Sequence, residues 1–67
     1  MKKELIKIRQ DRDYTQDEVS SYIGCTSRQF RRYENGESSI PFVKAVKWAK
    51  KLRISLTKFT TLYIKEE

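Results

Sequence analysis

The stretch that decides the fold is residues 15–36, which read TQDEVSSYIGCTSRQFRRYENG. It opens with Thr15 and Glu18 at the spacing of a capping box, in which each side chain bonds the backbone N–H of the other residue. Gly24 suits the left-handed residue that ends a helix. The stretch therefore predicts a first helix that begins after Thr15 and stops at Gly24.

The same pattern occurs a second time. Thr26 and Gln29 have the spacing of a second capping box, and Asn35 followed by Gly36 predicts the end of a second helix. Only residues 24–26 separate the two predicted helices. A connection this short that contains glycine is typical of a helix-turn-helix.

The rest of the chain has apolar residues at spacings of three and four, which predicts further helices. We expect one over about residues 2–12 with its lysines toward solvent, one over 40–52, and one capped by Ser55. The apolar face of the 40–52 helix is expected to consist of Phe42, Ala45, Val46, Ala49 and Leu52. The prediction is an all-α, compact five-helix domain over residues 1–67, frayed at 65–67.

The charge of the chain favours a polyanionic partner. Fifteen Lys and Arg against nine Asp and Glu give a formal charge of +6. Nucleic acid and an acidic membrane surface both fit this balance, and a basic surface that only keeps the domain in solution is the alternative. No apolar run has the length of a membrane span, and the N-terminus lacks the pattern of a signal peptide. Helices that lie on a membrane surface are typically one long amphipathic run, which two capped helices joined by a turn do not resemble, so we expect no membrane partner.

The composition argues against catalysis and metal binding. The chain has no His and one Cys, which cannot build a zinc site, and it has no glycine-rich phosphate loop. Cys25 precedes an N-cap, where a thiolate is stabilised, but its spacing to Phe30 is that of an apolar pair packed beside a cap. A single cysteine forms no internal disulfide, which fits a reducing cytoplasm. We expect no enzymatic activity, no cofactor and no small-molecule ligand.

One side of the helix predicted after Thr26 is strongly basic. Phe30 and Tyr33 share the opposite side and are expected to face the core. The polar arc consists of Ser27, Arg28, Arg31 and Arg32. Like charges on one helix face repel by a few tenths of a kcal/mol per pair, and a groove lined with phosphates would supply the missing negative charge. Arginine also makes bidentate contacts to guanine in the major groove. A solvated basic face is the alternative; the arc favours double-stranded DNA as the partner.

At these positions the sequence resembles the lambdoid phage repressor and Cro-type helix-turn-helix family, which includes xenobiotic-response-element-like regulators. The matching strings are YTQDEV at 14–19, IGCT at 23–26, YENG at 33–36 and AKKLRISL at 49–56. The resemblance covers about residues 5–59. It implies a lambda-repressor-like fold and a sequence-specific transcription regulator, a repressor of phage, plasmid or mobile-element genes that binds DNA as a homodimer.

The resemblance also implies roles for individual residues. The positions that read base edges are matched by Ser27, Arg28 and Arg32, with Arg31 between them as a base or phosphate contact. The candidate phosphate contacts are Gln16, Asn35, Ser38 and Ser39. Arg9 and Glu34 match an ion pair of the scaffold. Two positions depart from the family pattern: Ser20 replaces an alanine, so its hydroxyl needs a partner, and Arg53 replaces the glycine that ends the fourth helix.

The homodimer is expected to form through the last helix and residues 60–67. The candidate contact residues are Trp48, Leu62, Tyr63 and Ile64. For Trp48, a place in the core is the alternative. The alternative function is an antitoxin-like or other protein-interaction module that uses the same fold mainly to bind a protein partner. A companion gene or a co-purifying protein would distinguish the two.

Overall fold

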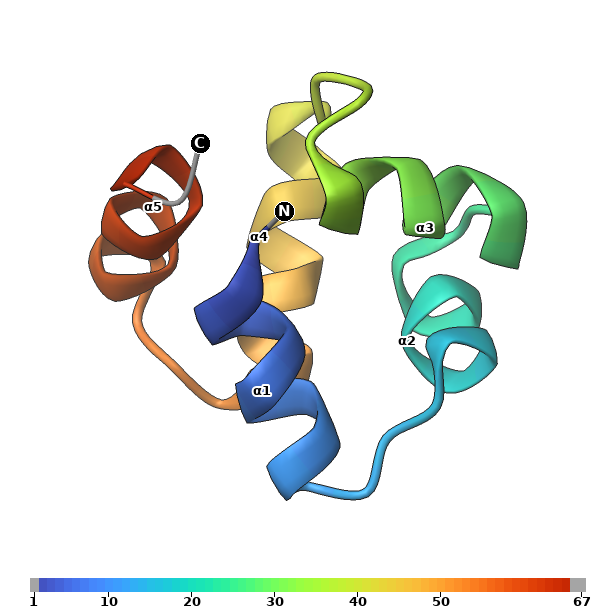
Figure 1. The fold of residues 1–67 in the computed structure, drawn as a ribbon, viewed down its shortest axis with the longest axis horizontal. Coiled ribbons are helices and arrows are strands. Elements are labelled where there is room, and N and C mark those ends of the chain that lie inside the picture. Colours follow the sequence, from blue (N-terminus) through green and yellow to red (C-terminus); the bar gives the residue numbers. More distant parts are fainter. Residues whose placement is uncertain (1, 66–67) are drawn as a thin grey trace.

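The computed structural model describes residues 2–65 as five helices joined by short connections (Figure 1). The helices are α1 (Lys3–Asp11), α2 (Gln16–Ile23), α3 (Ser27–Asn35), α4 (Phe42–Leu52) and α5 (Leu56–Lys65). The described chain contains no strand, so the predicted all-α class is confirmed. Helix α5 includes the backbone of Lys65, and the expected fraying of 66–67 lies outside the described residues.

Helix α2 begins and ends as the sequence predicts. The Thr15 hydroxyl accepts a hydrogen bond from the Glu18 N–H at 3.1 Å, and the Glu18 carboxylate accepts one from the Thr15 N–H at 2.9 Å. Gly24 ends the helix with φ of 84°, a left-handed conformation that costs glycine little. A complete capping box and a left-handed glycine thus fix both ends of α2.

Helix α3 keeps one half of its predicted capping box. Thr26 accepts a hydrogen bond from the Gln29 N–H at 3.1 Å, but the reciprocal bond from the Gln29 side chain is not formed within the described chain. Gly36 ends the helix with φ of 77°. The second capping box was therefore only partly right, because the Gln29 side chain is not drawn back to the threonine backbone.

The core is built around Trp48 on α4, which runs between α5 on one side and α2 and α3 on the other (Figure 1). The Trp48 ring packs edge-on against Phe30 at 4.9 Å and Phe59 at 5.0 Å between ring centroids. Its side chain is fully buried, with 0% exposed. Trp48 consequently offers no surface to a second chain and is not a dimer contact residue in this structure.

Lys2 lies inside the domain, although the lysines of this segment were expected to face solvent. Its backbone N–H bonds the Glu34 carbonyl at 2.8 Å, and its ammonium bonds the Tyr63 carbonyl at 2.7 Å. The ammonium also lies 4.3 Å from the centroid of the Tyr63 ring. A long apolar stem lets the charge reach the last turn of α5, where the helix carbonyls favour a cation.

Phe42 is exposed rather than buried. Pro41 is the N-cap of α4, without a side-chain cap from the preceding serines, so Phe42 is the first residue of the helix. The Phe42 side chain is 71% exposed, whereas Ala45, one turn later on the same predicted face, is buried. The helical periodicity was right, but the first turn of α4 extends beyond the cover that the neighbouring helices provide.

Arg53 closes α4 in place of the glycine usual in the family. It takes the left-handed conformation, with φ of 59° and ψ of 40°, and Ile54 N–H bonds back to the Ala49 carbonyl at 3.1 Å. A residue with a side chain pays a steric cost in this region of the backbone map. The helix thus ends with the geometry of a glycine cap although an arginine occupies the position.

Replacing Arg53 with glycine should therefore stabilise the protein. The left-handed conformation costs an L-residue about 1–2 kcal/mol, and glycine loses about 0.5–1 kcal/mol more backbone entropy on folding. Arg53→Gly should raise the free energy of unfolding by about 0.5–1 kcal/mol, measured by urea unfolding with Trp48 fluorescence.

Asp13 supplies the control, because it also has φ of 59°. Aspartate tolerates this conformation better than arginine, so Asp13→Gly should gain less. A drop in stability for Arg53→Gly would mean that the arginine side chain contributes more than its conformation costs.

Candidate nucleic-acid interface

Helix α3 presents one buried and one exposed side. Phe30, Tyr33 and Glu34 are 0%, 5% and 1% exposed, and they anchor the helix in the domain. The exposed side carries Arg28, Arg31 and Arg32. The sequence placed these arginines together, and the structure leaves all three at the surface.

The three arginines have no acidic partner among the described residues. Within residues 2–65, none of their guanidinium groups takes part in a hydrogen bond or ion pair. Their mutual repulsion is therefore not relieved by the described chain. This side of α3 is a row of cations whose hydrogen-bond donors point to solvent, which is the chemistry that binds phosphates and guanine edges.

The two helices of the motif are linked by small polar side chains. The Ser27 hydroxyl bonds the Asp17 carboxylate, and it also lies 3.4 Å from the Ser20 hydroxyl. Ser20 in turn donates to the Asp17 carbonyl in the preceding turn at 3.0 Å, which supplies the partner that its hydroxyl needs. Ser27, predicted to read a base, is thus also a link between α2 and α3, a role the sequence did not indicate.

Lys44 holds the turn between these helices. Its ammonium donates to the Gly24 carbonyl at 3.0 Å, and so binds the end of α2 from α4. Lys44 is not part of the apolar face that periodicity predicts for this helix. The contact joins residues 20 positions apart, so no local pattern in the sequence predicts it. The sequence shows only that Lys44 lies near the start of the predicted helix.

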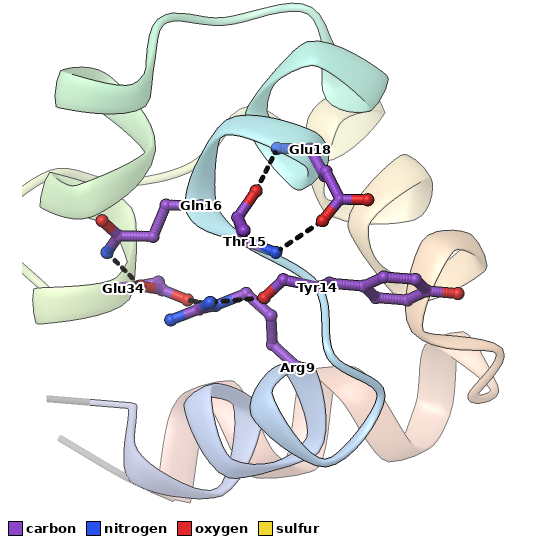
Figure 2. Close-up of polar contacts among 6 residues, drawn as sticks. All are labelled: Arg9, Tyr14, Thr15, Gln16, Glu18 and Glu34. Atoms are coloured by element: carbon purple, nitrogen blue, oxygen red, sulfur yellow. Dashed lines mark hydrogen bonds and ion pairs between the residues drawn. The ribbon is translucent and has the colours of Figure 1, made fainter.

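Glu34 connects three parts of the domain (Figure 2). One carboxylate oxygen lies 2.7 Å from Arg9 Nε, and the other accepts a bond from Gln16 Nε2 at 2.8 Å. A second Arg9 nitrogen, Nη1, donates to the Tyr14 carbonyl at 2.7 Å. The structure therefore contains the predicted Arg9–Glu34 pair, and it adds Gln16, whose side chain is held toward the end of α3.

The remaining candidate phosphate contacts lie at and after the end of α3. Asn35 donates to the Glu37 carboxylate at 3.3 Å, and the Ser38 carbonyl accepts a bond from the Tyr63 hydroxyl at 3.4 Å. Ser39 is exposed. Asn35 is the last residue of α3, and Ser38 and Ser39 lie in the loop between α3 and α4. The Glu37 carboxylate is the acidic group bonded to Asn35.

Cys25, in the turn of the motif, is half-buried and packed against the core. Burial raises the pKa of its thiol above the ordinary value, and the nearby Lys44 ammonium opposes this to a smaller extent. The thiol therefore stays protonated at neutral pH, which disfavours reaction as a nucleophile.

The model of a helix-turn-helix protein family matches residues 5–59. The chain belongs to the Cro/C1-type helix-turn-helix family. Searches among curated proteins and among solved structures found no significant match. A Cro/C1-type helix-turn-helix protein is a DNA-binding transcription regulator, and the match includes all of α2, α3 and α4. None of the helices within residues 2–65 has the length and apolar character needed to cross a membrane.

Removal of the Glu34 carboxylate should strongly destabilise this helix-turn-helix domain. Glu34→Ala would leave the Arg9 guanidinium buried without its counter-charge, a loss of about 3–5 kcal/mol in the free energy of unfolding. Denaturant unfolding of the unmodified protein and of Glu34→Ala measures this loss. Glu37→Ala, which removes an exposed carboxylate, should change stability by less than about 0.5 kcal/mol. Similar values for both variants would show that the buried pair does not hold the scaffold.

Proposed function

We propose that the protein is a sequence-specific repressor that binds double-stranded DNA as a homodimer, with α3 in the major groove. The observation that carries this proposal is the row formed by Arg28, Arg31 and Arg32, exposed and without acidic partners among the described residues. Family membership supports DNA binding as such. The repressor role rests on the resemblance to lambdoid repressors.

Affinity would come mainly from phosphates. Each phosphate that a cation neutralises releases counterions, which makes binding fall steeply with salt. The proposed phosphate contacts are Gln16, Asn35, Ser38 and Ser39. Gln16 is the first residue of α2, where backbone N–H groups favour an anion, and its bond to Glu34 fixes the direction of its side chain.

Sequence preference would come from α3. Arg28 and Arg32 lie opposite the buried Phe30 and Tyr33, so they extend furthest toward a groove that receives the helix. A bidentate arginine–guanine contact contributes about 1–3 kcal/mol of discrimination. Ser27 precedes Arg28, and Arg31 lies between Arg28 and Arg32; these two are the secondary base-reading candidates.

Two substitutions separate the two contributions. Arg28→Ala should weaken specific binding by about 1–3 kcal/mol and relax the preference for guanine at one position of the site. Gln16→Ala should weaken binding about equally on specific and random DNA. Selection of bound sites from random DNA, followed by affinity measurements, tests both. Lys7→Ala, on the exposed side of α1, is the control. Equal losses on specific and random DNA for Arg28→Ala would refute base reading.

The proposed dimer contact lies on α5. Leu62 and Tyr63 are half-buried against the core of their own chain, whereas Ile64 is 62% exposed. Ile64 and the exposed Phe42 line one groove of about 460 Å³ between α5 and the start of α4. Two exposed apolar side chains at one groove gain from being covered, and a second copy in two-fold symmetry would cover them.

Ile64→Asp should therefore shift the protein toward monomer. Sedimentation velocity at micromolar concentration measures the change, and binding to a duplex with two half-sites should weaken more than binding to a single half-site. Val43→Asp removes a side chain of similar exposure, 64%, that does not line the groove. If both variants sediment alike, or if the unmodified protein is monomeric with and without DNA, the proposed dimer contact is wrong.

A further inference from the structure

A second basic surface lies on the side of α2 that faces the end of α4. It surrounds a shallow depression of about 250 Å³ and consists of Tyr14, Tyr22, Lys50, Lys51 and Arg53, which we call the basic–aromatic patch. The Lys51 ammonium lies 4.4 Å from the centroid of the Tyr14 ring and 5.4 Å from that of the Tyr22 ring. Two tyrosines therefore hold one cation in a defined position, a contact favourable in itself.

The cations of this patch are not paired with acidic groups of the described chain. Within residues 2–65, Lys50, Lys51 and Arg53 form no ion pair. Glu18, which lies between the two tyrosines along the chain, accepts the Thr15 N–H as part of the capping box. The patch therefore presents three positive charges, and Lys50 and Arg53 are exposed to solvent.

The patch is separate from the proposed DNA contacts. Lys51 follows Phe42 by nine residues, which places it about 14 Å further along α4, away from the loop that carries Ser38 and Ser39. Figure 1 shows that loop and the α4–α5 connection at opposite ends of α4. In Figure 2 the Gln16 side chain points toward α3, whereas the Tyr14 ring points the other way, toward α4.

We propose that the basic–aromatic patch binds an acidic segment of a partner protein and leaves α3 free to contact DNA. The depression is smaller than the roughly 300–1,000 Å³ of ordinary small-molecule pockets, which favours a surface contact. The tyrosine faces already hold Lys51, so they do not serve as stacking platforms for bases. Three cations and two phenol groups, partly immobilised before binding, match a short run of carboxylates. This proposal does not depend on the identity of the DNA site.

The direct test uses a fluorescent peptide of alternating glutamate and glycine as the probe. Backbone amide shifts on peptide addition should be largest at Tyr22 and at residues 50–53. In affinity measurements, the triple variant Lys50→Gln, Lys51→Gln, Arg53→Gln should bind the peptide about tenfold more weakly, the loss typical of three exposed ion pairs. Shifts confined to α3 would overturn the proposal.

A matched control removes the same charge elsewhere. The variant Lys3→Gln, Lys7→Gln, Lys58→Gln changes three exposed lysines of α1 and α5. It should lower the affinity for the peptide by less than about threefold. Equal losses of peptide affinity in the two triple variants would show that only net charge matters, and would refute a binding site at the patch. DNA affinity should be the same in both variants; a greater loss in the patch variant would make the patch a DNA contact instead.

The tyrosines provide a charge-neutral arm of the experiment. Tyr22→Phe retains a ring face for Lys51, whereas Tyr22→Leu does not. The leucine variant should bind the peptide more weakly than the phenylalanine variant, because the cation is less well positioned. Equal affinities would contradict the role assigned to the ring, and unfolding measurements on both variants confirm that the domain remains folded.

Discussion

The carboxylate of Glu34 is the constraint on which the arrangement of the motif depends. It lies at the end of α3, fully buried, and receives Arg9 from α1 and Gln16 from the start of α2. The backbone carbonyl of the same residue accepts the Lys2 N–H. A buried carboxylate needs this degree of satisfaction, because an unpaired charge in the interior is costly. Satisfying it fixes α1, α2 and α3 relative to one another.

Trp48 provides the complementary apolar constraint. Its edge-on contacts with Phe30 and Phe59 join α3 and α5 to α4 through one buried side chain. Because α3 contributes Phe30 and Tyr33 to this interior, its arginines face outward. The core therefore sets the direction of the basic side of α3, and the polar network around Glu34 sets its position along the motif.

The lysines of α4 show how one charged helix serves several purposes. Lys44 binds the carbonyl at the end of α2, and Lys51 packs against two tyrosine rings, so both are engaged within the domain. Lys47 and Lys50 are exposed. The basic side chains behind the net charge of +6 therefore have different roles. Some stabilise the motif, and others lie on two separate surfaces, α3 and the basic–aromatic patch.

The sequence by itself determined the helices and their order, because the signals concerned are local. Thr15, Glu18 and Gly24 act on backbone groups within four residues, and the spacing of Phe30 and Tyr33 determines which side of α3 is buried. The Arg9–Glu34 pair also came from sequence, through the resemblance to a family. The tertiary structure decided the contacts that join distant segments: Lys2 with Tyr63, Lys44 with Gly24, and Lys51 with Tyr14 and Tyr22. It also buried Trp48 and exposed Phe42, because burial depends on which neighbouring helix covers a residue, and helical periodicity carries no information on where that cover ends.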